Sequence, residues 1–170
     1  LILSYQPLTS IPTGIQADEK QLRQVLLNLL SNAIKFTHQG EVRLTLEMLE
    51  ENEIDGQSQA LLRFSVNDTG VGIAPDQLDT IFQPFEQVGD EKQHTEGTGL
   101  GLAISYQILQ RMGHELCVES ELGQGSRFWF EIRVPVEEIE EPETTSVGLR
   151  IGSQRYRGKE MGWQHILYNQ

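Results

Sequence analysis

Three polar side chains on one predicted helix are the first residues whose types and spacing could do chemistry. Asn28, Asn32 and Lys35 follow one another at intervals of four and three residues. On a helix this spacing places them within roughly 60° of one another, along one edge of the apolar face. Asparagine offers an uncharged oxygen ligand, which suits a Mg²⁺ ion that phosphates already hold, and lysine can meet a phosphate as a point charge. Taken alone, the pattern also fits solvated polar residues on a helix rim.

Asp68 is a second candidate because it ends a predicted strand within the stretch "NDTGVGI". Its carboxylate could accept a hydrogen bond from an exocyclic amine such as that of adenine. Gly70 and Gly72 would then let a flat ring approach the backbone closely. A simpler interpretation is a turn in which the aspartate bonds to its own backbone.

A third candidate is the stretch "GTGLGLAI", residues 97–104, in which glycines alternate before an apolar run. A glycine turn that leads into a helix leaves free backbone N–H groups that can face an anion. The spacing is not that of the dinucleotide fingerprint, and no Gly-Lys-Ser/Thr follows as in a Walker A loop. On its own, the stretch predicts a tight turn that could also hold phosphate.

The elements that must position these residues alternate between helix and strand. A helix is predicted over 18–37, with Asp18 as N-cap and Gln21 completing a capping-box pattern. Its apolar face is formed by Leu22, Val25, Leu26, Leu29, Leu30 and Ala33. Strands are predicted at 41–49, 60–68, 114–120 and 127–134, a loop at 52–59, a short helix at 75–82 and a long helix at 100–112. These elements predict a sheet covered on one face by helices.

Composition narrows the class of protein. The chain has 170 residues, 38% of them hydrophobic, which suits one domain with a proper core. A net charge of −12 argues against a nucleic-acid surface. The single cysteine, Cys117, excludes an internal disulfide, is expected to be buried and fits a reduced, cytoplasmic setting. No apolar run approaches the roughly 20 residues of a membrane span, so we expect no membrane contact by this segment.

Five stretches occur in one order: "LRQVLLNLLSNAIKFT", "NDTGVGI", "IFQPFEQ", "GTGLGLAI" and "GQGS". Together they resemble the catalytic and ATP-binding domain of sensor histidine kinases, within the superfamily that includes gyrase, Hsp90 and MutL. The resemblance covers roughly residues 18–136, with 1–17 as a leading strand. It implies an α/β (α+β) two-layer sandwich of the Bergerat type, in which about three helices cover one face of a mixed sheet of about five strands. We therefore expect an ATP-binding domain over 1–136, followed by an acidic linker and poorly ordered tail over 137–170.

The resemblance also assigns roles, with ATP and Mg²⁺ as cofactors. It implies that Asn32 binds Mg²⁺ with Asn28 beside it, that Lys35 faces phosphate and that Asp68 reads adenine. Residues 86–97 match a mobile lid. The other residues implied to bind the nucleotide are Gly70, Gly72, Ile73, Phe82, Phe85, Gly97, Thr98, Gly99, Leu100, Gly101, Leu102 and Ser126.

Two positions bear on the kind of reaction. Hydrolytic members of the superfamily usually carry a glutamate at the position of Asn28, where it acts as general base on water. An amide cannot take a proton at neutral pH, so the resemblance implies that the γ-phosphoryl is kept for another acceptor. Many members also place an arginine in the lid, for which Lys92 is the substitute here, and these two side chains are not equivalent. A weakly catalytic regulatory module and an anti-sigma-type serine kinase therefore remain open as alternatives.

The expected partners lie outside this chain. None of the four histidines, at 38, 94, 114 and 165, stands in the sequence context of a phosphoacceptor. We therefore expect an upstream phosphoacceptor and dimerisation domain, and a response regulator receiver domain as the next acceptor. The family dimerises mainly through that upstream domain, so a monomer or weak dimer is expected here. The stretch "VGLRIGSQRYR" resembles the linker of hybrid kinases, whereas residues 158–170 match nothing expected.

Overall fold

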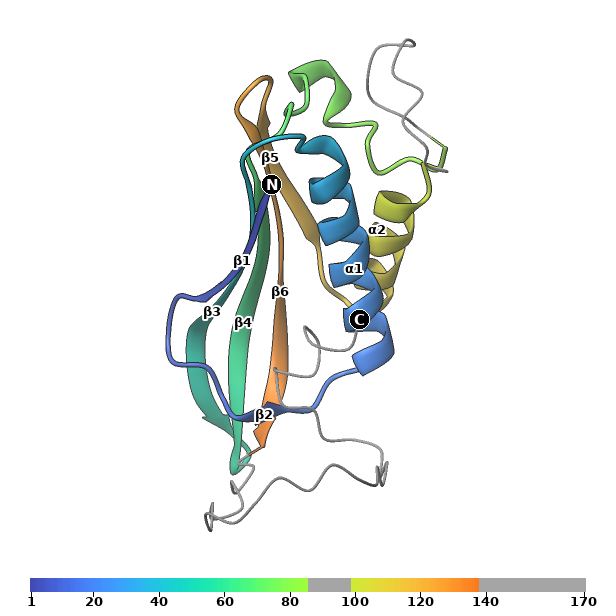
Figure 1. The fold of residues 1–170 in the computed structure, drawn as a ribbon. Helices are drawn as coiled ribbons and strands as arrows, with labels where there is room; N and C mark the ends of the chain where they lie inside the picture. Colours follow the sequence, from blue (N-terminus) through green and yellow to red (C-terminus); the bar gives the residue numbers. More distant parts are fainter. Residues whose placement is uncertain (86–98, 138–170) are drawn as a thin grey trace, which may run out of the picture.

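The computed structural model describes residues 1–85 and 99–137, and Figure 1 shows their arrangement. A mixed sheet forms one layer, and the helices α1 (Glu19–Phe36) and α2 (Gly101–Arg111) cover one of its faces. The predicted two-layer sandwich is therefore confirmed. The predicted lid over 86–97, with Lys92 and Gly97, lies wholly outside the described residues, as do Thr98 and the predicted tail from residue 138.

The sheet contains six strands among the described residues. They are β1 (Ile2–Pro7), β2 (Gly14–Ile15), β3 (Glu41–Ile54), β4 (Gln57–Asp68), β5 (Leu116–Glu121) and β6 (Gly125–Glu137). The order is β1-β3-β4-β6-β2, and β5 also pairs with β6. Only β1 and β3 run parallel. The sheet has one strand more than expected because the leading segment forms two strands, β1 and β2.

Helix α1 forms as its sequence predicts. The Asp18 carboxylate accepts a hydrogen bond from the Gln21 backbone N–H at 3.1 Å, which caps the first turn. The buried side chains of α1 are Leu22, Val25, Leu26, Leu29 and Ala33. They pack on inward-facing residues of β3, β4 and β6, among them Phe64 and Phe130, whose rings stack at 5.2 Å. Inward-facing and outward-facing residues alternate along each of these three long strands. The apolar inward-facing residues therefore fix the position of α1 over the sheet.

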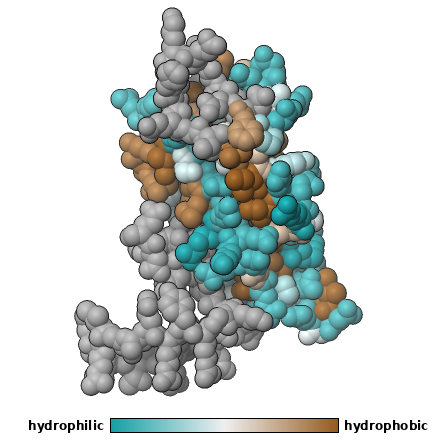
Figure 2. Space-filling view, turned by 90° about the vertical axis from the view of Figure 1, so that its right-hand side faces the viewer, coloured by the Kyte–Doolittle hydropathy of each residue, from teal (hydrophilic) through white to brown (hydrophobic). Residues whose placement is uncertain are grey.

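The helical side is not uniformly polar. Figure 2 looks onto this side and shows apolar surface among hydrophilic residues. Leu27 and Ile34 are the exposed large apolar side chains of α1. Neither α1 nor α2, the α-helices of the described residues, is long and apolar enough to cross a membrane.

The predicted loop over 52–59 is wrong, because β3 and β4 continue through it as one long hairpin. Only Asp55 and Gly56 separate the strands, and both have positive φ, +52° and +76°. Two consecutive left-handed residues are what a two-residue hairpin loop requires. Pairing between the strands therefore outweighs the polar composition of the segment.

Two smaller expectations also fail. The short helix predicted over 75–82 is a single 3₁₀ turn, η1 (Pro75–Gln77), followed by turns, so the described residues hold two α-helices where about three helices were expected. Cys117 is only partly buried, because it alternates with the inward-facing Leu116 on β5.

Candidate functional site

Asp68 lies where β4 ends, opposite Ser126 at the start of β6. Its Oδ1 accepts a hydrogen bond from the Gly70 backbone N–H at 2.8 Å. This contact confirms the simpler interpretation of a turn in which the aspartate bonds to its own backbone. It also holds the carboxylate in a fixed direction at the edge of the sheet.

The electrostatic state of Asp68 is unusual for a carboxylate. Burial raises the pKa of Asp68 above its ordinary value, although the backbone N–H groups of Gly70 and Ser126 and the nearby Thr37 hydroxyl act to lower it. Burial dominates because water is excluded and the charged form is disfavoured. A half-buried carboxylate of this kind gains from an additional hydrogen-bond donor, such as an exocyclic amine.

Thr37, at the end of α1, adds a buried hydroxyl that lies near the Asp68 carboxylate. The residue is 2% exposed, and its Oγ1 has no hydrogen bond of normal geometry. A Cβ added at Gly70 would collide with the Phe36 carbonyl oxygen, and it would lie 2.8 Å from Thr37 Oγ1 and 2.9 Å from Asp68 Oδ1. Only glycine therefore fits at residue 70 in this arrangement. Buried hydroxyls are rarely left without a regular partner, so Thr37 Oγ1 would gain from a polar ligand atom or a water beside Asp68.

The glycine loop that follows Asp68 is clamped by its neighbours. Gly72 has φ +68°, and a Cβ there would lie 2.0 Å from the Glu121 carbonyl oxygen. Gly123 N donates to the Val71 carbonyl at 2.7 Å, and Ile73 N donates to Ser120 Oγ at 2.8 Å. The loop is thus held against the β5–β6 hairpin mainly by its backbone.

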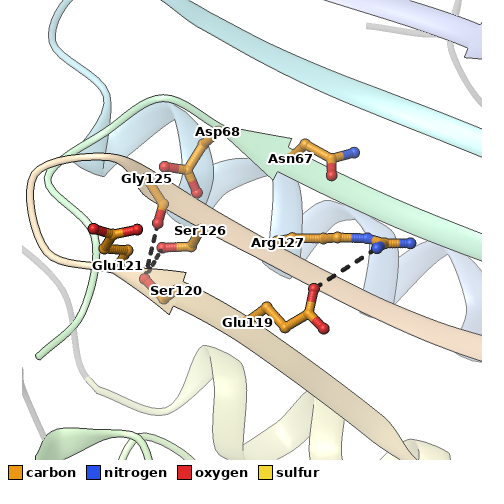
Figure 3. A pocket seen from close by; sticks show the side chains of 8 residues that line it. All are labelled: Asn67, Asp68, Glu119, Ser120, Glu121, Gly125, Ser126 and Arg127. Atoms are coloured by element: carbon orange, nitrogen blue, oxygen red, sulfur yellow. Dashed lines mark hydrogen bonds and ion pairs between the residues drawn. The ribbon is translucent and has the colours of Figure 1, made fainter. Parts of the chain in front are cut away.

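A pocket of about 440 Å³ adjoins this end of the sheet (Figure 3). It is lined by Asn67, Asp68, Glu119, Ser120, Glu121, Gly125, Ser126 and Arg127. Ser120 Oγ lies 2.9 Å from both the Gly125 carbonyl and Ser126 Oγ, and Arg127 pairs with Glu119 at 3.7 Å. Of the predicted site residues in the described part of the chain, only Asp68 and Ser126 line this pocket. It therefore adjoins the predicted base side and not the predicted phosphate side.

The predicted phosphate side is formed where α1 meets α2. Asn28 Nδ2 donates to the Gly101 carbonyl at 3.2 Å and to Ser105 Oγ at 3.1 Å. A Cβ added at Gly101 would lie 3.9 Å from Asn32 Nδ2. The structure therefore brings both asparagines to the first turn of α2, although more than 60 residues separate each asparagine from Gly101 in the sequence. Lys35 lies on the same helix, with its Nζ 4.9 Å from the centre of the Phe36 ring.

The start of α2 leaves backbone donors available. Leu100 is the N-cap, and no side chain caps this end of the helix. The hydrogen bond from Ile104 N to the Leu100 carbonyl, 2.9 Å long, marks the start of the regular helical pattern. The N–H groups before it have no partner within the helix, and the helix dipole favours an anion there. Gly99, with φ +67°, turns the chain into this position.

The remaining predicted site residues divide into packed and exposed ones. Phe82 stacks on Tyr106 at 5.3 Å, and Ile73 and Leu102 pack against the core. Phe85 is 74% exposed with φ +68°, and its N–H bonds to the Gly99 carbonyl at 3.1 Å. This bond ties together the two chain ends that flank residues 86–98.

Acidic side chains do not provide a ready-made metal site. The described part of the chain holds no group of three or more His, Cys, Asp or Glu side chains that could bind a metal. A Mg²⁺ at the α1–α2 contact would take the carboxamide oxygens of the two asparagines, with further oxygens coming from the nucleotide phosphates. Two carboxamide oxygens therefore fit a metal ion that binds together with the nucleotide.

Comparison with known proteins shows the family of this chain. Residues 17–137 match the family model described as histidine kinase-, DNA gyrase B-, and HSP90-like ATPase. The chain is 47% identical over 122 residues to the sensor histidine kinase AruS of Pseudomonas aeruginosa, which covers 71% of this chain and 12% of AruS. It is 38% identical over 145 residues to the aerobic respiration control sensor protein ArcB of Escherichia coli, covering 83% of this chain and 18% of ArcB.

The similar solved structures are also histidine kinases or similar to them in fold. Full-length ShkA in complex with AMPPNP is 43% identical, with a TM-score of 0.63, over 81% of this chain and 26% of that one. The catalytic domain of the histidine kinase ThkA is 28% identical, with a TM-score of 0.59, over 79% of this chain and 80% of that one. The chain spans 6% to 15% of the length of the first three curated relatives. It belongs to the family of histidine kinase-, DNA gyrase B- and HSP90-like ATPases, as an ATP-binding catalytic domain of the kind found in sensor histidine kinases.

Proposed function

We propose that this domain binds ATP as its Mg²⁺ complex and donates the γ-phosphoryl group to a histidine on a dimerisation domain of a longer protein. In this step an imidazole nitrogen attacks the γ-phosphorus, the bond to the β–γ bridging oxygen breaks, and ADP leaves. The phosphoryl group is then relayed to an aspartate on a response regulator. Among the described residues, His38 is exposed and His114 partly buried, and neither has the sequence context of an acceptor.

The observation that carries this proposal is the carboxamide of Asn28 beside Gly101. Its position is the one at which hydrolytic members of the superfamily usually place a glutamate. A carboxamide cannot accept a proton at neutral pH, and Asn28 already donates its N–H groups to α2. This residue therefore does not activate water, which favours transfer to another acceptor over hydrolysis.

Each residue then has a role in positioning the nucleotide. Asp68 would accept from the adenine amine, while the free N–H groups at the start of α2 and the Lys35 ammonium would face the phosphates. Asn32 and Asn28 would hold Mg²⁺, which, when bound, neutralises charge on the phosphate oxygens. Such transfer depends mostly on positioning and on electrostatic stabilisation. Lys92 is proposed to supply the lid cation.

Mixing the chain with the phosphoacceptor helices of its parent protein and γ-labelled ATP tests the proposal. Acid-labile label on histidine supports it. Tight nucleotide binding without transfer would favour a regulatory module, and acid-stable label on serine of a partner would favour the anti-sigma-type alternative. Arg substituted for Lys92 would show whether the lid limits the transfer rate, because the two cations differ in geometry.

The isolated chain is further proposed to be a monomer in the cytoplasm. This follows from the family resemblance, in which dimerisation resides in the phosphoacceptor domain. Light scattering after size-exclusion chromatography would test the monomer. The location would be tested with a tagged form of the parent protein.

A further inference from the structure

Ser105 is a buried polar residue on α2 to which the proposed function gives no role. It is 0% exposed, and its Oγ donates to the Gly101 carbonyl at 3.0 Å. A serine inside a helix commonly bonds back one turn in this way. Ser105 does more, because the same oxygen also accepts from Asn28 Nδ2 at 3.1 Å.

These bonds determine which way the Asn28 carboxamide points. An asparagine side chain has one donor end and one acceptor end, and its hydrogen-bond partners decide between the two orientations. The Gly101 carbonyl can only accept, and the Ser105 hydroxyl has given its proton to that carbonyl. Both partners therefore require Nδ2 on the α2 side. The opposite orientation would set Oδ1 against the Gly101 carbonyl oxygen, and Ser105 could donate to Oδ1 only by giving up its bond to that carbonyl.

We propose that Ser105 is a positioning residue that keeps Asn28 Oδ1 turned away from α2, where it is available to the Mg²⁺ of a bound nucleotide. This inference rests on the proposed function. Ser105 acts through Asn28 and does not itself contact the metal. Groups that orient metal ligands from behind typically change metal affinity 10- to 100-fold when removed.

The same contact couples two parts of the site. Gly101 begins α2 and belongs to the turn whose free N–H groups face the phosphates, whereas Asn28 lies on α1. Ser105 and Asn28 together hold these two helices in register at this point. Metal ligand and phosphate donors are therefore positioned by one small network.

Calorimetric titration of the full chain with AMPPNP, in Mg²⁺ and again in EDTA, tests this. Ser105→Ala should weaken binding about tenfold in Mg²⁺ and by less than about twofold in EDTA, because only the metal ligand has lost its orientation. Ser31→Ala is the matched control. Ser31 also makes a serine-to-backbone bond, to the Asn28 carbonyl at 3.0 Å, but it is exposed and does not touch the carboxamide. It should leave both affinities unchanged.

A double-mutant cycle with Asn28→Ala identifies the route. If Ser105 acts through Asn28, adding Ser105→Ala to Asn28→Ala should cause no further loss in Mg²⁺. Equal losses in Mg²⁺ and EDTA, or fully additive losses, would overturn the inference while leaving the proposed function intact. A wild-type chain that bound no AMPPNP would overturn both.

A second variant keeps the test valid if the alanine variant folds poorly. Ser105→Cys is close in size and replaces a strong acceptor with a weak one. The Asn28 Nδ2 protons, followed by NMR, should lose their protection from solvent exchange in this variant. Unchanged protection would contradict the proposed role.

Discussion

The proposed base side and the proposed phosphate side of the candidate site are built by different means. On the base side, the end of α1, the 69–73 loop and the β5–β6 hairpin meet mainly through backbone groups. On the phosphate side, α1 and α2 meet through the side chains of Asn28 and Ser105. The comparison indicates that the base pocket tolerates almost no added atom. The phosphate side should instead respond to changes of side-chain chemistry.

Gly72→Ala should have the largest effect, because it breaks the base side directly. The added Cβ would lie 2.0 Å from the Glu121 carbonyl at a residue with φ +68°. We expect a loss of about 3 kcal/mol in the free energy of unfolding, measured by urea denaturation. Gly123→Ala, with φ +83° but nothing within 4 Å, isolates the conformational cost and should lose only about 1 kcal/mol.

Gly101→Ala extends the same test to the phosphate side. Its Cβ would meet side-chain atoms only at 3.9 Å or more, which is ordinary contact. Stability should therefore stay within about 1 kcal/mol of wild type. Equal losses in the free energy of unfolding for Gly72→Ala and Gly101→Ala would contradict the distinction between the two sides.

Asp68→Asn should separate nucleotide binding from stability. Asparagine keeps an oxygen that can accept from Gly70 N, but it presents a weaker acceptor to the adenine amine. Affinity for ATP should fall about 10- to 100-fold, with reduced preference over GTP, as measured by calorimetry. Asp76→Asn, at an exposed position in η1, is the control. Unchanged affinity in Asp68→Asn would remove this residue from the site.

The raised pKa of Asp68 predicts a pH dependence of opposite sign to that of a salt-bridged carboxylate. A pKa that is higher in the folded than in the unfolded state means that the folded state binds the proton more tightly. The charged carboxylate therefore costs stability above the folded-state pKa, and this cost disappears below the unfolded-state value of about 3.9. Asp68→Asn should thus be at least as stable as wild type at pH 7. That advantage should shrink as the pH falls, which urea unfolding at several pH values will show.

The sequence predicts some parts of this molecule well because their determinants are local. Helix α1 follows from its apolar spacing and from Asp18, and α2 from the apolar run after Gly101. The 52–59 segment was mispredicted because its polar residues are paired only through the long hairpin. Motifs predict Asp68 and the two asparagines as site residues, although no local pattern shows that Asn28 contacts Gly101.

Thr37, Ser105 and Ser120 could not be identified from sequence for a related reason. Each lies beside groups that only tertiary packing brings close. Asn28 and Ser105 are 77 residues apart, and Ile73 and Ser120 are 47 apart. A hydroxyl in a helix or strand carries no sign of such a partner. The motifs therefore predict a candidate site, whereas only the fold shows which residues pack around it.

Thr37→Val should have the smallest effect and tests whether the base side uses its unpaired hydroxyl. Valine has nearly the same shape, and removing a buried hydroxyl without a partner should leave stability equal or slightly higher. Affinity for ATP should fall about three- to tenfold if that hydroxyl meets the nucleotide or a water beside Asp68. Thr45→Val, on β3 away from the loop, should leave affinity unchanged. If Thr37→Val also leaves affinity unchanged, the base is held by Asp68 and the backbone alone. That result would strengthen the comparison between a base side formed by backbone groups and a phosphate side formed by side chains.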